Sequence, residues 1–371
     1  MGNGARTRKN QAEAAQIGNE AHPGLTRNLL GQDHAITEFL ESWNHKRPHH
    51  AWLLQGAQGI GKATLAFHIA RFILHFGSNS VPEMGLGFTD QQTDALPNSL
   101  DIPEYSPLFD QLVKGAHNDF RYIAKLEDKT QINVDQIREL LHFTSLTAGS
   151  GGWRIIIIDS ANDLTNAAAN ALLKLLEEPP KNTMLLLIAH QAGRLLPTIR
   201  SRCRNLVLEP LQNNVIMDIL GDHYQASPPS DSGAVLPLAQ GSAGRALKIL
   251  RLDGALIYNS MLSMLGTPKS DNFNARKSLA IQMTGNMGKE RFSLFGEMLS
   301  FWAMQSCKYK LSNDKKAFSF SPLEQAAYDH YFAPITAAEA FAQLERWQGL
   351  ITKNKPPANL DPAQLIHVMF G

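Results

Sequence analysis

The stretch from Trp153 to Cys203 constrains the fold of this chain more than any other. It opens with four consecutive isoleucines, Ile155 to Ile158, and this run ends at Asp159. A run that is apolar on both sides of the backbone is typical of a strand whose two faces are both covered. We therefore predict a strand over residues 154–158 that is buried in the middle of a sheet.

A helix and a second strand are predicted directly after it. Residues 167–176 combine strong helix formers with apolar side chains at helical spacing, and Pro179 and Pro180 stop the helix soon afterwards. Residues 184–189 form another apolar run. Strand, helix and strand at this spacing predict a crossover between neighbouring parallel strands, and hence an α/β fold.

Asp159 stands at the carboxyl end of the first of these strands. Open α/β sheets bind their ligands at this edge, so an acidic residue here is a candidate for a site. The alternative is structural, because Asp159 could cap the next helix or accept a bond from a loop amide.

A second motif lies earlier in the chain. Residues 50–55 predict a short buried strand, and residues 65–76 have the pattern of a helix. Between them stand Gly56, Gly59, Gly61 and Lys62, which is the arrangement of a phosphate-binding loop. In such a loop glycines let successive N–H groups face the phosphate oxygens, the helix N-terminus adds positive partial charge, and the lysine neutralises the outer phosphates.

One part of that motif is missing. The residue after the lysine should carry the hydroxyl that binds magnesium, but it is Ala63 here, and Thr64 comes one place late. On a helix this displacement turns the hydroxyl by about 100°. We expect phosphate binding more readily than hydrolysis. A purely structural strand-to-helix turn is the alternative.

Composition describes an ordinary globular protein with several domains. The chain has 371 residues, 43% of them hydrophobic, and a formal net charge of +1, so no overall basic field points to nucleic acid. No apolar run is long enough to span a membrane, and the two cysteines have neither a disulfide nor a metal-site spacing. The expectation is a cytoplasmic protein without membrane contact, whose residues 1–20 form a disordered polar arm.

Gly and Pro residues, which interrupt helices and strands, divide the chain further. We predict an α/β phosphate-loop domain over residues 21–210, interrupted by a long loop or insertion over 77–115 that is rich in Gly and Pro. A small helical domain should follow over 211–253. Every signal is helical from 254 to 371, which predicts a third, all-α domain.

Taken together, these motifs resemble bacterial clamp-loader subunits of the AAA+ class. The resemblance covers residues 22–252, and the all-α tail matches that family's collar domain in position and size. It rests on the G-x-x-G-x-G-K-x-T loop, the I-I-I-I-D strand, N-A-L-L-K-L-L-E-E-P-P, S-R-C and G-S-A-G-R-A. The N-A-L-L-K-x-L-E-E-P-P segment followed by S-R-C is highly specific, whereas a lone phosphate loop is not.

The resemblance implies roles for single residues. Gly56, Gly59, Gly61 and Lys62 match the family's phosphate loop, and Asp159 matches its magnesium-orienting acid. Active members have a glutamate after that acid, which polarises the attacking water, and this chain has Ser160. The four-cysteine zinc module of the family is also missing, because residues 77–115 contain no cysteine. We therefore expect no zinc, no catalytic magnesium, and weak ATP binding or none.

Arg202 matches the arginine of S-R-C, which in the family reaches across a subunit interface to the γ-phosphate held by a neighbour. Arg245 matches the second sensor arginine in the small lid domain, and His190 falls where active members place a polar sensor. Each has an ordinary alternative: Arg202 as a surface ion-pair partner, Arg245 as part of a helix N-terminus, and His190 as a structural residue.

The function implied is that of a non-catalytic ring subunit. It would supply Arg202 in trans while scarcely hydrolysing ATP itself, bind sister subunits of the delta and tau/gamma types, and help place a sliding clamp on primed DNA. One alternative is a working AAA+ ATPase, either in the same assembly or as an independent motor. A nucleic-acid-binding module is the third, and the neutral charge balance disfavours it.

Overall fold

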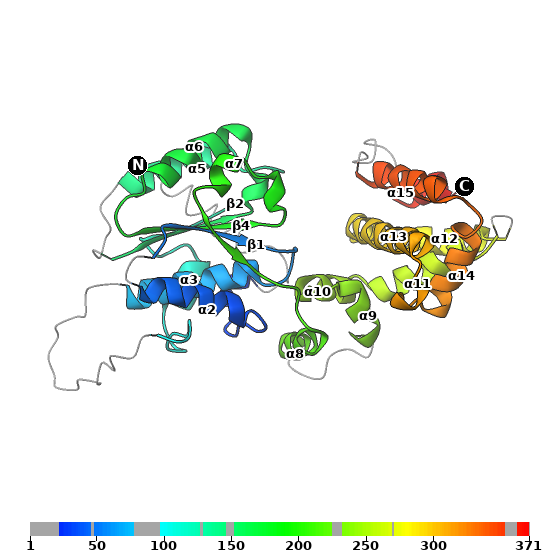
Figure 1. The fold of residues 1–371 in the computed structure, drawn as a ribbon, viewed down its shortest axis with the longest axis horizontal. Coiled ribbons are helices and arrows are strands. Elements are labelled where there is room, and N and C mark those ends of the chain that lie inside the picture. The colour runs from blue at the N-terminus through cyan, green and yellow to red at the C-terminus, as the bar shows by residue number, and fades with distance from the viewer. Residues whose placement is uncertain are drawn as a thin grey trace. The chain divides into compact units, whose positions relative to one another are not determined.

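The structure is a computed structural model that describes residues 22–45, 48–77, 97–126, 129–145, 152–224, 232–268, 271–352 and 362–370. The chain forms two compact units (Figure 1). The first comprises Met1–Ile219 with Gly241–Gly244, and the second Leu220–Gln240 with Arg245–Gly371. The predicted polar arm, residues 1–20, lies outside the described residues.

The first unit is built on a parallel sheet of five strands in the order β2-β3-β4-β1-β5. The strands are β1 (Ala51–Gln55), β2 (Phe120–Ala124), β3 (Arg154–Asp159), β4 (Thr183–Ala189) and β5 (Arg204–Val207). Every neighbouring pair is parallel, including the predicted pair of β3 and β4. The α/β fold predicted from the isoleucine run is therefore confirmed.

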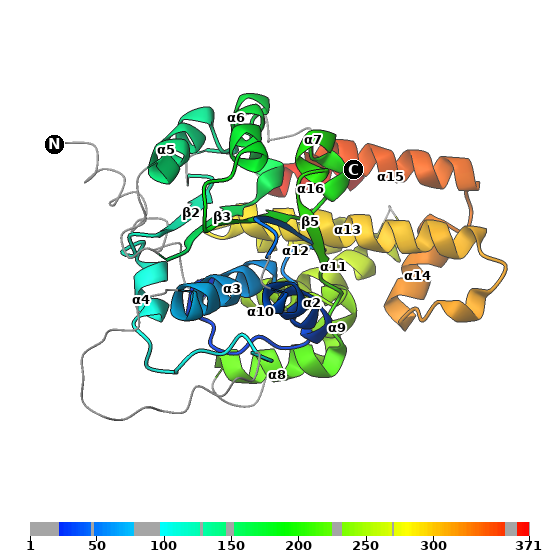
Figure 2. The same ribbon diagram turned by 60° about the vertical axis from the view of Figure 1, so that its left-hand side comes forward.

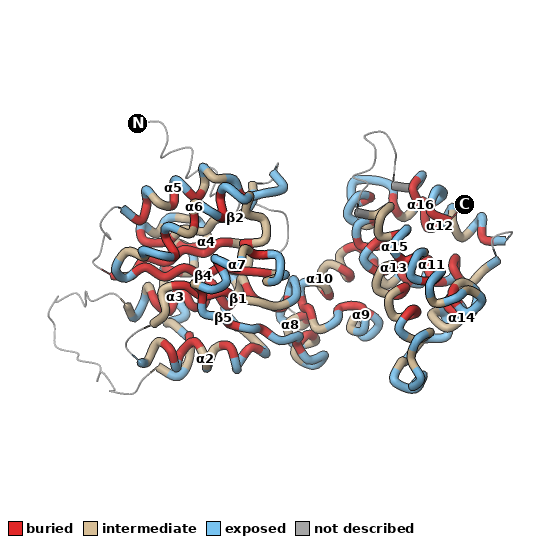
Figure 3. The backbone as a smooth tube through the Cα atoms, turned by 45° about the horizontal axis from the view of Figure 1, so that its top comes forward, coloured by how far each residue is buried: buried red, intermediate tan, exposed pale blue. Residues whose placement is uncertain are grey.

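Helices cover both faces of this sheet (Figures 1 and 2). On one face lie α2 (Asp33–Asn44) and α3 (Lys62–Phe76), and on the other α5 (Val134–Ser145), α6 (Asn166–Glu177) and α7 (Pro197–Arg200). Ile155 and Ile157 belong to the core on the α3 side, and Ile156 and Ile158 to the core on the α6 side. The strands are therefore buried along both faces (Figure 3), which explains the unbroken isoleucine run.

The predicted loop over 77–115 is only partly correct. Residues 78–96 lie outside the described residues, but Leu108–Val113 form a short helix, α4. Leu108 and Leu112, one helical turn apart, are both buried against the α3 side of the core. Short 3₁₀ turns complete the unit: η1 (Pro23–Leu25), η2 (Ala161–Asp163) and η3 (Ala192–Arg194).

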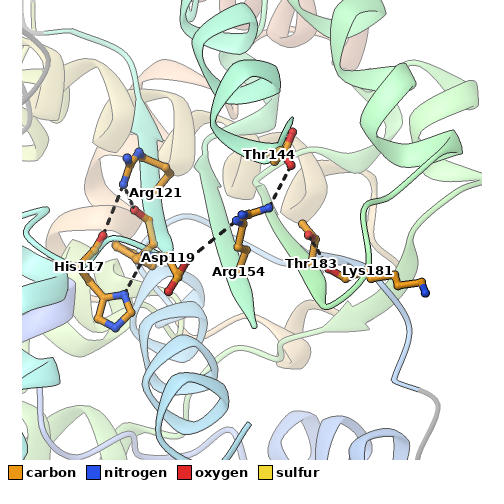
Figure 4. A network of polar contacts seen from close by, with 8 residues as sticks. His117, Asp119, Arg121, Thr144, Arg154, Lys181 and Thr183 are labelled. Carbon is orange, nitrogen blue, oxygen red and sulfur yellow. Dashed lines mark hydrogen bonds and ion pairs between the residues drawn. The ribbon is translucent and has the colours of Figure 1, made fainter. Parts of the chain in front are cut away.

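A buried polar network ties together the amino ends of the strands (Figure 4). The Arg154 guanidinium, at the start of β3, lies 4.0 Å from the Asp119 carboxylate and donates to Thr144 O at 3.0 Å. Both charged side chains are 6% exposed. The backbone N–H of Asp119 donates to His117 Nδ1. This network closes the sheet edge opposite to Asp159.

All of the regular secondary structure described in the second unit is helical, as predicted for the C-terminal part. Its helices are α9 (Ser232–Ala239), α11 (Gly254–Leu265), α12 (Phe273–Gln282), α13 (Gly288–Leu311), η4 (Lys315–Ala317), α14 (Pro322–Tyr331), α15 (Ala337–Thr352) and α16 (Pro362–Phe370). Helices α8 (Asn213–Tyr224) and α10 (Ala243–Arg251) each extend across a boundary of the two units. Trp302, Phe332 and Trp347 form its aromatic centre. The predicted division at residues 210 and 253 stays a prediction.

None of the helices that the structure describes is long and apolar enough to cross a membrane.

Candidate nucleotide loop and interface arginine

The glycine-rich segment after β1 makes a tight turn into α3. Gly56 and Gly61 have φ angles of +146° and +104°, which side chains rarely tolerate. A Cβ on Gly56 would lie 2.5 Å from Ile60 Cδ1 and 2.7 Å from Leu208 O. The loop is therefore a close-packed strand-to-helix turn that leads directly into the N-terminus of α3.

Lys62 folds back onto the loop instead of extending from it. Its ammonium donates to Gly56 O at 2.8 Å and also to Ala57 O. Burial lowers the pKa of Lys62 to about 8, and the nearby Asp159 carboxylate partly opposes this shift. The cation that would neutralise outer phosphates is therefore engaged by carbonyl oxygens of its own loop.

A distant segment also contacts the loop. Ser242 Oγ donates to Gln58 O at 2.8 Å, and Gly244 N–H donates to Gly59 O at 2.9 Å. A Cβ on Gly244 would stand 2.9 Å from Gly59 Cα, so only glycine allows this approach. The G-S-A-G-R-A segment, residues 241–246, resembles the family's motif, but its contact with the loop has no local signal in the sequence.

Asp159 faces the loop but is already engaged. Tyr122, on the neighbouring strand β2, donates its hydroxyl to Asp159 Oδ2 at 3.0 Å. Burial raises the pKa of Asp159, while the Tyr122 hydrogen bond and the Lys62 charge oppose the shift. Neither alternative proposed for Asp159, a helix cap or a loop amide, matches this contact. Tyr122 was missed, since only the register of β2 against β3 brings the two residues together.

The residues at this edge do not fit a catalytic magnesium ion. Ala63, the second residue of α3, has no hydroxyl, and Thr64 is the third. Ser160 accepts a hydrogen bond from the backbone N–H of Asn162 at 3.1 Å and so caps the start of η2. Position 63 therefore offers no oxygen to bind magnesium, and position 160 offers no carboxylate to act as a base for the attacking water.

His190, the predicted sensor position, directly follows β4. Its backbone N–H donates to Asn162 Oδ1 at 2.8 Å. Burial lowers the pKa of His190 to about 4, and the Lys62 charge adds to the effect. The imidazole is therefore neutral near pH 7. Asn162, which braces the ends of β3 and β4, is a residue that sequence analysis did not single out.

Arg202 lies at the opposite edge of the sheet from the loop. It directly precedes β5, whose Arg204 pairs in register with Trp52 near the start of β1. The loop follows the other end of β1, after Gln55. At 3.3 Å per residue the strand separates the two by roughly 13 Å. The arginine and the loop of the same chain therefore face different sides of the unit.

The three residues of S-R-C each have a distinct environment. Arg202 Nη2 lies 2.8 Å from Glu177 Oε1, and Nη1 donates to Thr198 O at 2.9 Å. Its side chain is still 35% exposed. Ser201 Oγ donates to Thr198 O, and Cys203 is buried in the core beneath. The ion-pair alternative for Arg202 is thus realised with Glu177, while part of the guanidinium still faces solvent.

Cys203 should be chemically inert in the folded chain. Burial raises the pKa of its thiol to about 12, and burial also raises the pKa of Cys307, the second cysteine. We expect neither thiol to react with a disulfide reagent at pH 8 within minutes, and both to react once guanidinium unfolds the chain. Rapid labelling of Cys203 in the native protein would show that the segment carrying Arg202 is not packed as described.

Arg245 belongs to the second unit, on α10. Burial lowers the pKa of its guanidinium, and the Glu297 carboxylate opposes the shift. Its sensor role stays a prediction. The structure thus gathers the predicted loop residues, Asp159 and His190 at the carboxyl edge of one sheet, and separates Arg202 from them.

The first unit has the fold of a P-loop α/β protein. Its parallel sheet is covered by helices on both faces, a glycine-rich loop joins β1 to α3, and an acid ends β3. Residues 99–212 match the protein family described as "DNA polymerase III, delta subunit". The chain is 29% identical over 276 residues to DNA polymerase III subunit delta' of Pseudomonas aeruginosa, covering 74% of this chain and 77% of that protein.

Two further relatives are also subunits of DNA polymerase III. DNA polymerase III subunit delta' of Escherichia coli is 31% identical over 216 residues, covering 58% of this chain and 59% of that protein. DNA polymerase III subunit tau of the same organism is 26% identical over 258 residues, covering 67% of this chain and 37% of that protein. The chain is thus similar over much of its length to delta' and tau subunits of DNA polymerase III.

Proposed function

We propose that this chain is a delta-prime-like subunit of a DNA polymerase III clamp loader. It supplies Arg202 to a triphosphate bound by a neighbouring subunit, and its own loop does not hydrolyse ATP. The observation that carries the proposal is the position of Arg202, partly exposed at the sheet edge opposite to the chain's own loop. An arginine placed there serves a site outside its own nucleotide loop.

The chemistry follows from the guanidinium. A phosphoryl group in transfer spreads negative charge over three oxygens, and a planar cation with several N–H donors stabilises that charge. Arginines that act this way across an interface contribute roughly 10³–10⁵ in rate. In this chain Nη1 of Arg202 donates to Thr198 O at 2.9 Å and to Ser201 Oγ at 3.4 Å, and Nη2 lies 2.8 Å from Glu177. The guanidinium has five N–H donors, and the side chain is 35% exposed, so donors are left to face outward.

The state of the loop supports a non-catalytic role. Lys62 is bound to loop carbonyls, Ala63 offers no magnesium ligand, and Ser160 replaces the base that would polarise water. Phosphoryl transfer depends almost entirely on positioning and electrostatic stabilisation, so losing these parts leaves little turnover. ATP binding at this loop would be weak or absent. Residues 77–115 contain no cysteine that could bind zinc.

The partners follow from the family. Sister subunits of the delta and tau/gamma types are the proposed neighbours, with the sliding clamp and primed DNA engaged through the whole assembly in the cytoplasm. The small helical domain over residues 211–253 would act as a lid and the helical part from 254 to 371 as a collar that holds the subunits together. The described C-terminal helices, packed around Trp302 and Trp347, support a stable helical body of this kind.

Replacing Lys62 tests the loop directly. We expect Lys62→Ala in the reconstituted clamp loader to change ATP turnover by less than about twofold, because a site that lacks Mg²⁺ ligands contributes little rate. Lys174→Ala, at an exposed position on α6, is the matched control. Loss of most of the turnover in Lys62→Ala alone would favour the rival function, a working AAA+ ATPase at this loop.

A further inference from the structure

Helix α6 ends with a charge that its dipole disfavours. Glu177 is its last helical residue, and Pro179 and Pro180 follow the C-cap and prevent the helix from continuing. The C-terminus of a helix carries negative partial charge, so a carboxylate there opposes helix stability. Helix stability therefore does not account for Glu177 at this position, whereas its ion pair with Arg202 does.

That ion pair joins the two most specific motifs of the chain. Glu177, from L-L-E-E-P-P, binds Nη2 of Arg202, from S-R-C, at 2.8 Å. On the other side of the guanidinium, Thr198 O accepts from Nη1 at 2.9 Å. Nη1 also donates to Ser201 Oγ at 3.4 Å. Contacts on both terminal nitrogens thus fix the plane of the group, while Glu177 itself stays 48% exposed.

Both ends of this arrangement are held by packed structure. Leu172, Leu175 and Leu176 of α6 share one core with Ile199 and Cys203 around Arg202. The ring of His50, just before β1, is hydrogen-bonded through Nε2 to Leu176 O at 3.0 Å and thus holds the end of α6. Glu177 is therefore carried on a rigid element, as a residue that orients another side chain should be.

We propose that Glu177 is a positioning residue for Arg202, which rests on the interface role proposed above. It holds the guanidinium in one orientation at the surface before a neighbour's triphosphate arrives. A free arginine side chain would lose rotamer entropy on engaging the phosphate, and a pre-oriented one loses less. The carboxylate keeps Nη2 while the remaining N–H donors of Arg202 meet the phosphate oxygens.

The test is ATP turnover by the reconstituted clamp loader with variants of this subunit. Glu177→Ala should lower kcat by about 10- to 100-fold, the scale of losses from misplacing a catalytic group, and leave KM for ATP unchanged. Glu177→Gln keeps an acceptor for Nη2 and should recover to within about threefold of the unchanged chain, since the geometry rather than the charge is retained. The double variant Glu177→Ala/Arg202→Ala should be no slower than Arg202→Ala alone.

Glu178→Ala is the matched control, because it removes a neighbouring carboxylate at the same helix end and should leave kcat unchanged. If Arg202→Ala slows turnover but Glu177→Ala does not, or if Glu177→Ala speeds it, the positioning role is wrong and the interface role stands. If Arg202→Ala itself has no effect, the interface role is wrong. Circular dichroism of each variant, expected to match the unchanged chain, separates these results from misfolding.

Discussion

Arg202→Ala should remove most of the ATP turnover at the site that this subunit serves while leaving the subunit folded. The expected loss at that site is roughly 10³–10⁵ in rate, the range measured for arginines that stabilise the transferring phosphoryl across an interface. Folding should survive, because the side chain is 35% exposed and its ion pair with Glu177 is exposed to solvent. Pre-steady-state hydrolysis of ATP by the reconstituted assembly measures this loss, because it separates one silent site from others that still turn over.

Arg138→Ala provides the control for removing a surface arginine. Arg138 also forms an exposed ion pair within its own chain, with Asp135 at 3.0 Å, but it lies on α5 away from the S-R-C segment. Its replacement should leave turnover unchanged. An assembly that contains Arg202→Ala and hydrolyses ATP at the full rate at every site would remove Arg202 from the mechanism.

Asp119→Ala should destabilise the first unit by about 3–5 kcal/mol, the usual consequence of leaving a buried charge without its counter-ion. The carboxylate of Asp119 faces the Arg154 guanidinium at 4.0 Å, and both side chains are 6% exposed (Figure 4). Hydrogen exchange of the amides in β3, compared with those in α13, should show the loss in the first unit alone.

A paired replacement distinguishes a lost ion pair from a lost contact. Asp119→Ala combined with Arg154→Met removes the buried charge with its partner and should recover much of the stability, because apolar residues often substitute for a buried pair without penalty. Asp135→Ala, at the exposed pair with Arg138, should change stability by less than about 1 kcal/mol. Equal losses from Asp119→Ala and Asp135→Ala would contradict a buried, structurally important pair.

The parts of the fold that the sequence predicted well are those with an unambiguous local pattern. Ile155–Ile158 and residues 184–189 are unbroken apolar runs, a pattern typical of strands buried on both faces. The helix between these two runs indicated that the strands pair in parallel, and they do. Helix α4 was missed because Gly and Pro residues surround it. Its only local signal was the pair Leu108 and Leu112, one turn apart and both buried.

The candidate site was predictable residue by residue but not contact by contact. Lys62, Asp159 and Arg202 were all singled out, yet the groups that engage them come from distant parts of the chain. Tyr122 reaches Asp159 through strand register, and Glu177 reaches Arg202 through the packing of α6 on the S-R-C segment. No local periodicity encodes such pairs, so only the folded chain shows that both charged groups are already held.

The central claim is that the loop does not hydrolyse ATP and that Arg202 acts at a neighbouring subunit's site. The most direct test compares ATP turnover by the isolated chain with turnover by the assembly that contains it. We predict no turnover above background from the isolated chain, and a large gain when the unchanged chain, but not Arg202→Ala, joins its partner subunits. Turnover by the isolated chain at the rate of the assembly, abolished by Lys62→Ala, would contradict this account.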